Sequence, residues 1–223
     1  MKIRLLSHKT DLLSYSEKYK KIGSSLEVGT PVVPLEYLSN NLVYGFYKNG
    51  QQVAGFIIGI NAPFRSIEIF TPSELRETLM VFLNNGHEVC ELAGFWIQDD
   101  CTDFFDNIFI WNSVRQKINI KGKKFFMGGT FVKGMANLCS FASYAHLICT
   151  GKVNDKPSWV IITWTRYAIV SLLQVIIYKV IKGIYKSLGQ RMSNYIQFDN
   201  KAMINVAKEL KSDPSTIDML TIS

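Results

Sequence analysis

The sequence predicts a mixed α/β fold, with a mostly antiparallel central sheet flanked by helices and a long amphipathic helix near the C-terminal end. Three observations predict this class. Residues 42–60 place two apolar, aromatic runs around Asn49-Gly50, which is the strongest local signal for an antiparallel hairpin. Strand patterns and helix patterns then alternate from residue 71 to residue 164. Finally, residues 165–190 are strongly apolar and carry lysines at helical spacing.

Length and charge bound the organisation of the chain. Its 223 residues are 48% hydrophobic and 19% charged, which is the composition of one globular domain. We expect a single domain over residues 1–223, with its core at about 40–165 and a basic, apolar helix at about 165–190. Net charge is +7, and residues 152–191 carry seven positive and one negative side chain. This basic segment favours an anionic membrane surface or an acidic partner. Nucleic acid is disfavoured because the segment is very apolar and no recognised nucleic-acid motif is present.

Cysteine and histidine usage predicts no metal site. The four cysteines have no CxxC spacing, and the chain has three histidines. The first fifteen residues lack the long apolar run of a secretory signal. We therefore expect a cytoplasmic protein with free thiols. If the basic helix binds lipid, it would place the protein at the inner face of a membrane.

Local patterns predict the remaining elements in chain order. They are helix and loop over 1–40, a strand at 65–70, a helix beginning with a capping box at Thr71 and Glu74, a central strand at 87–98, a helix at about 99–118, a strand at 124–131 interrupted by two glycines, a helix at 135–147, a turn at 154–157 and a strand at 159–164.

This order of elements resembles the GNAT superfamily of acyl-CoA N-acyltransferases over roughly residues 40–165. The segment LVYGFYKNGQQVAGFIIG resembles the early antiparallel strands of that family, and CELAGFWI resembles its central strand. FFDNIFIWNSVRQKI resembles the helix that follows, and KFFMGGTF the strand that splays from its neighbour. The resemblance implies an acyl thioester bound in a cleft between two splayed strands. It also implies transfer of the acyl group to an amine, with acyl-CoA or an acyl carrier protein as donor and no metal.

The loop between the central strand and the next helix departs from the family. The family has a glycine-containing loop there, whose bare amides bind the pyrophosphate of coenzyme A at the helix N-terminus. Residues 98–103 read QDDCTD, contain no glycine and carry carboxylates that would repel a pyrophosphate. Either the donor is held differently, or it is not coenzyme A, or catalysis has been lost. The aspartates also have the DDxxD spacing of magnesium-diphosphate sites, but stabilisation of the helix N-terminus explains them better.

Six residues are candidates for the chemistry. Glu91 lies in an apolar strand, where burial would raise its pKa and suit it to take a proton from the amine; the alternative is a strand-edge residue that faces water. Gly128, Gly129 and Thr130 could expose backbone amides to the acyl donor, or mark a plain bulge. Tyr144 could protonate a thiolate leaving group and His146 could relay protons; the alternative is a satisfied structural pair.

Two function classes remain open from the sequence. The first is an acyltransferase acting on a small-molecule or lipid-like acceptor, whose donor could be presented by an acidic acyl carrier protein that pairs with the basic segment. The second is a non-enzymatic module that binds a membrane surface or a protein partner through the C-terminal helix.

Overall fold

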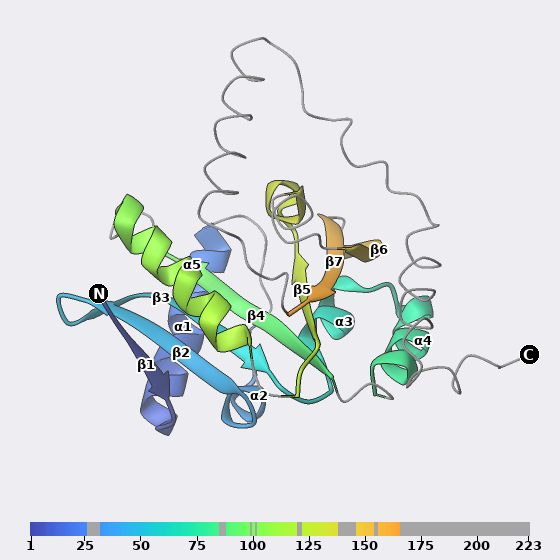
Figure 1. Cartoon of the computed structure of the whole chain (residues 1–223), viewed down its shortest axis with the longest axis horizontal. Helices are drawn as coiled ribbons and strands as arrows, with labels where there is room; N and C mark the ends of the chain where they lie inside the picture. The colour runs from blue at the N-terminus through green and yellow to red at the C-terminus, as the bar shows by residue number, and fades with distance from the viewer. Residues whose placement is uncertain are drawn as a thin grey trace, which may run out of the picture.

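The computed structural model describes residues 1–25, 32–84, 88–98, 100, 102–119, 122–137, 146–153 and 156–165, and within these ranges seven strands form one sheet (Figure 1). The strand order is β1-β2-β3-β4-β5-β7-β6. The strands are β1 (Lys2–Leu6), β2 (Leu42–Lys48), β3 (Gln51–Gly59), β4 (Val89–Ile97), β5 (Phe125–Thr130), β6 (His146–Val153) and β7 (Lys156–Trp164). Neighbouring strands run antiparallel except β4 and β5, which are parallel. The predicted mixed, mostly antiparallel sheet is confirmed.

Helices cover both faces of this sheet. They are α1 (Lys9–Ser25), α2 (Leu35–Ser39), α3 (Arg65–Phe70), α4 (Ser73–Asn84) and α5 (Phe104–Ile118). Helix α5 packs on one face, where Ile110 and Val114 join a core cluster with Cys90 of β4. The other four helices pack on the opposite face, as Figure 1 shows for α1 and α5. Because side chains alternate along a strand, Cys90 and Leu92 face α5, whereas Glu91 faces the opposite helices.

The hairpin of β2 and β3 forms as the sequence predicts. Asn49 has φ 53° and Gly50 has φ 80°. Both central residues of the turn therefore lie in the left-handed region, as a two-residue hairpin turn of type I′ requires.

Four local predictions were wrong, and each error concerns a segment whose structure depends on distant residues. Residues 65–70 form helix α3 rather than a strand, with Ile67 buried against the sheet. Residues 2–6, predicted as helix or loop, form edge strand β1 on β2. The helix predicted over 135–147 does not reach its expected end, because residues 146 and 147 open β6, which pairs with β7. Strand β5 runs through both glycines without interruption.

Two sequence predictions fall on residues that the structure does not describe. The C-terminal helix predicted at about 165–190 lies, beyond Thr165, outside the described residues. Tyr144 also lies outside them. None of the helices in the described ranges is long and apolar enough to cross a membrane.

Candidate active site

Strands β4 and β5 pair at their beginnings and separate at their ends. The parallel ladder joins Val89 to Phe125 and ends with Leu92 beside Gly128. Beyond that point β4 stays paired with β3 up to Ile97, and β5 stays paired with β7 up to Thr130. Each strand follows its outer neighbour, so a V-shaped opening forms between them, and Figure 1 shows the two strands diverging.

A cavity of about 420 Å³ occupies this opening. Its volume lies in the range typical of small-molecule sites. Most of the residues that line it are apolar or aromatic, and they come from both faces of the sheet. The walls include residues 92–97 of β4, 128–130 of β5, Trp111 and Val114 of α5, Tyr19 and Ile22 of α1, and Arg65, Ser66 and Phe70 of α3. The cavity therefore reaches from the α5 face through the sheet to the α1 and α3 face.

A bulge in β4 shapes one wall of the cavity. Gly55 pairs with Trp96 and Ile57 pairs with Ala93, so β4 holds one more residue than β3 between these pairs. Gly94, within the bulge, has φ 56°, a conformation that favours glycine. The hydroxyl of buried Tyr15 in α1 donates a hydrogen bond to the Gly94 carbonyl. Helix α1 therefore fixes the bulge at which β4 turns away from β5.

The three residues predicted on β5 all line the cavity. Gly128 is the last residue of β5 that pairs with β4, and Gly129 and Thr130 belong to the part of β5 that leaves it. Gly129 serves a packing requirement, because an added Cβ would lie 2.4 Å from the ring of Phe70. The Phe70 ring in turn contacts the Phe131 ring, with centroids 4.5 Å apart and the ring planes tilted by 46°. The glycine therefore allows an aromatic pair to form part of the wall.

Glu91 is fully buried directly behind the cavity and is not among its lining residues. One carboxylate oxygen accepts from the Tyr37 hydroxyl at 2.7 Å and from the Arg65 backbone amide at 2.9 Å. The other oxygen accepts from the Ser66 amide. Gly59 leaves room for the Tyr37 hydroxyl, because a Cβ at position 59 would lie 2.8 Å from that hydroxyl. The carboxylate thus anchors the start of α3 to the sheet, and the alternative of a water-facing strand edge is wrong.

Burial dominates the electrostatics around Glu91. It raises the pKa of the Glu91 carboxyl, because a charged carboxylate loses its hydration there, and the hydrogen bonds from Ser66 and Tyr37 oppose that shift. Burial and the neighbouring carboxylate also raise the pKa of the Tyr37 hydroxyl. The Glu91–Tyr37 pair therefore favours a state in which the Tyr37 hydroxyl keeps its proton and donates a hydrogen bond to Glu91.

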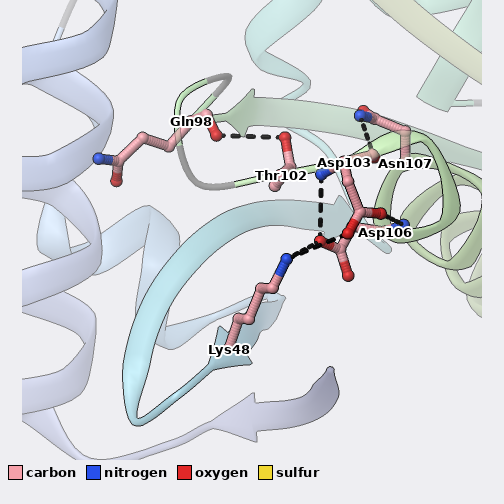
Figure 2. A network of polar contacts seen from close by, with 6 residues as sticks. All are labelled: Lys48, Gln98, Thr102, Asp103, Asp106 and Asn107. Carbon is pink, nitrogen blue, oxygen red and sulfur yellow. Dashed lines mark hydrogen bonds and ion pairs between the residues drawn. The ribbon is translucent and has the colours of Figure 1, made fainter.

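Carboxylates occupy the N-terminus of α5, where the GNAT resemblance would place a pyrophosphate (Figure 2). The Asp103 side chain accepts from the Asp106 amide at 2.9 Å, and the Asp106 side chain accepts from the Asp103 amide at 3.1 Å. Lys48 of β2 forms ion pairs with both, at 3.3 Å from Asp103. This reciprocal capping box confirms that the acids stabilise the helix start. The amides of Asp103 and Asp106 are therefore engaged within the protein itself.

His146 opens β6 opposite Ile162 of β7, so its backbone lies in an edge strand and β7 separates it from β5. Its predicted role, like that of Tyr144, stays a prediction. Among the residues that the structure describes, no group of three or more His, Cys, Asp or Glu side chains is placed to hold a metal.

Three residues around the site were missed in the sequence. Tyr15, Tyr37 and Arg65 come from α1, α2 and α3, and each contacts β4 over a long sequence separation. A single aromatic or basic residue on a helix gives no local signal of such contacts. The nearest clue was the isolated acid in an apolar strand, since a buried carboxylate requires donors from elsewhere.

Comparison with known proteins supports the fold. No family model matches the sequence, and no curated protein matches it either. Among solved structures, FeeM, an N-acyl amino acid synthase from uncultured soil microbes, has a TM-score of 0.61 at 10% identity, over 78% of this chain and 97% of that chain. A ribosomal-protein-alanine N-acetyltransferase from Brucella melitensis has a TM-score of 0.49 at 14% identity, over 74% and 99% of the two chains. The AHL synthase LasI also has 0.49, at 13% identity, over 76% and 94%. The chain has a divergent GNAT-like fold, as the sequence predicted.

Proposed function

We propose that this protein is an acyltransferase that moves an acyl group from a thioester to an amine. The observation that carries this proposal is the cavity between the separated ends of β4 and β5, which reaches both faces of the sheet. Two substrates could enter from opposite faces and meet where the strands part. The mostly apolar walls suit an acyl chain. The GNAT-like fold, shared with a protein named as an N-acyl amino acid synthase, agrees with this chemistry.

The donor in this proposal is a thioester on an acyl carrier protein rather than acyl-CoA. A helix N-terminus binds a pyrophosphate through unoccupied amides and its positive dipole end. At α5 the amides of Asp103 and Asp106 already bond to carboxylates, and Lys48 balances one of the two negative charges. A carrier protein needs no diphosphate site there, because its own protein surface would supply the remaining affinity.

The transfer step follows from thioester chemistry. The amine nitrogen attacks the thioester carbonyl carbon, an amide C–N bond forms and the C–S bond breaks. The thiolate leaves and takes up a proton, while the ammonium formed at nitrogen loses one. The sequence predicted Glu91, Tyr144 and His146 for these proton transfers, and we propose Tyr144 and His146 for them. For Glu91 we propose a positioning role, because its buried carboxylate does not line the cavity and holds the amides of Arg65 and Ser66 at the cavity wall.

The test compares two donors that carry the same dodecanoyl chain, one on a carrier protein and one on coenzyme A, with thiol release as the readout. We expect amine-dependent thiol release from the carrier thioester and little from the CoA thioester. Gly129→Val, whose Cβ would lie 2.4 Å from the Phe70 ring, should distort the cavity wall and abolish release from the protein that remains folded by circular dichroism. Gly134→Val is the matched control, because a Cβ at that exposed glycine meets nothing within 4 Å. Absence of release from either donor with a panel of amines would refute the proposal.

The alternative of a membrane-surface module rests on the C-terminal helix, which lies outside the described residues. A cytoplasmic location is proposed with the carrier-protein donor.

A further inference from the structure

Helix α1 places a phenol hydroxyl, that of Tyr19, at the wall of the cavity. Among the described lining residues, the hydroxyl side chains are those of Tyr19, Ser66 and Thr130. The Ser66 side chain hydrogen-bonds to Glu91, and the Thr130 hydroxyl accepts from the Val132 amide at 3.0 Å. Within the described part of the chain, no hydrogen bond joins the Tyr19 hydroxyl to another residue. Of the lining hydroxyls, that of Tyr19 is therefore the one left to bind a ligand.

The Tyr19 hydroxyl lies close to the point at which β4 and β5 part. Tyr15 and Tyr19 are one turn apart, so their rings share a face of α1. The Tyr15 hydroxyl donates to the Gly94 carbonyl, in the bulge at which β4 turns away from β5. The charges of Arg65 and Glu91 both act on the Tyr19 hydroxyl, and Glu91 directly precedes the last residue of β4 that pairs with β5. Substrates that meet where the strands part would therefore meet within reach of this hydroxyl.

The surroundings of Tyr19 favour a hydroxyl that keeps its proton. Burial raises the pKa of this hydroxyl, because a phenolate would lose its hydration there; the charge of Arg65 opposes that shift and the charge of Glu91 adds to it. The phenol is therefore a hydrogen-bond donor at neutral pH. A hydrogen bond made away from water is electrostatically stronger than one made at the surface.

We propose that the Tyr19 hydroxyl donates a hydrogen bond to the carbonyl oxygen of the acyl thioester and stabilises the negative charge that develops on it during transfer. The inference rests on the proposed acyltransferase function and adds a catalytic residue to it. When the amine nitrogen attacks the carbonyl carbon, the π electrons of the C=O bond move onto the oxygen. They return when the C–S bond breaks and the thiolate leaves. Tyr19 keeps its proton throughout, so its contribution is purely electrostatic.

Tyr19→Phe removes this donor and keeps the ring. We expect kcat for transfer from the dodecanoyl carrier thioester to fall about 100-fold, with little change in KM, because the bond strengthens as charge develops on the oxygen. Tyr47→Phe is the matched control. Tyr47 lies on β2, where its ring stacks with Arg4, and it is not among the residues that line the cavity. Its variant should leave kcat unchanged.

Infrared spectroscopy of a bound thioester tests the contact without requiring turnover. The probe is S-dodecanoyl pantetheine, isotope-labelled at its carbonyl carbon and added to the full chain without any amine. A hydrogen bond to the carbonyl oxygen weakens the C=O bond, so we expect the labelled band to move to lower wavenumber on binding. Most of this shift should be lost in Tyr19→Phe and retained in Tyr47→Phe.

Absence of binding or of a band shift with the unmodified protein would overturn the inference, even if the Tyr19 variant fails to fold. An unchanged shift or an unchanged kcat in folded Tyr19→Phe would also overturn it, and would leave the acyltransferase standing. The reverse outcome separates the two proposals. A shift that depends on Tyr19, without transfer to any amine of the panel, would support the contact and refute the proposed function alone.

Discussion

Replacing Glu91 by glutamine tests the buried carboxylate behind the cavity. The two oxygens of Glu91 accept three hydrogen bonds, from the Tyr37 hydroxyl and from the amides of Arg65 and Ser66. A glutamine side chain offers one oxygen, and its NH₂ group would face at least one of these donors. A buried donor without an acceptor costs about 1–3 kcal/mol. We expect Glu91→Gln to lower the free energy of unfolding by an amount of that order at a pH at which the carboxylate is ionised and its two oxygens accept all three bonds.

The difference between the two proteins should depend on pH, with a sign that follows from burial. The pKa of Glu91 is raised in the folded state. The folded protein therefore binds this proton more tightly than the unfolded chain, and the associated stability is fully present below the ordinary carboxyl pKa of 4.5. This stability is lost as the pH rises from there through the folded-state pKa, by at most about 1.4 kcal/mol per pH unit. Glutamine does not titrate, so the advantage of the unmodified protein should shrink as the pH rises.

Urea denaturation of both proteins at a series of pH values from 4 to 8 measures this difference, since titrations common to both cancel. Glu36→Gln, at an exposed position of α2 next to Tyr37, is the matched control and should leave the unfolding curve nearly unchanged. A difference between Glu91→Gln and the unmodified protein that stays constant over this range would refute the reasoning. It would mean that Glu91 titrates alike in the folded and unfolded states.

Three further substitutions have definite expected outcomes. Gly129→Ala should destabilise the protein by about 1–3 kcal/mol in chemical denaturation, because the new methyl group meets an aromatic ring of α3 at 2.4 Å; Gly128→Ala, whose Cβ has only an ordinary contact at 3.5 Å, should cost clearly less. Tyr15→Phe removes the hydroxyl that bonds to the bulge carbonyl without changing the ring, and should cost about 1 kcal/mol; unchanged stability would show that the bulge does not need this bond. Asp103→Ala should lower the melting temperature by removing the cap of α5, whereas Asp100→Ala, at an exposed position before the helix, should not.

The sequence alone predicted the elements whose signals are local. Asn49-Gly50 between two apolar runs is sufficient for a hairpin turn, because both residues tolerate positive φ. The aspartates before residue 104 predicted a helix start, and Asp103 caps α5 as expected. Glu91 was identified as unusual because a charged residue inside an apolar strand must be compensated. Each of these inferences depends on residues that are close together in the chain.

Tertiary structure alone decided the site. The segment 65–70 alternates polar and apolar residues as a strand would, yet it is a helix whose first amides donate to a carboxylate 25 and 26 residues away. Strands β1 and β6 exist as edges of the sheet because β2 and β7 offer them partners. The opening between β4 and β5 arises because each strand follows a different outer neighbour. Sequence patterns report which side of an element is apolar, whereas a cavity depends on where several elements stop touching. The position of such a cavity is determined by long-range strand pairing and helix packing, which no short stretch of sequence encodes.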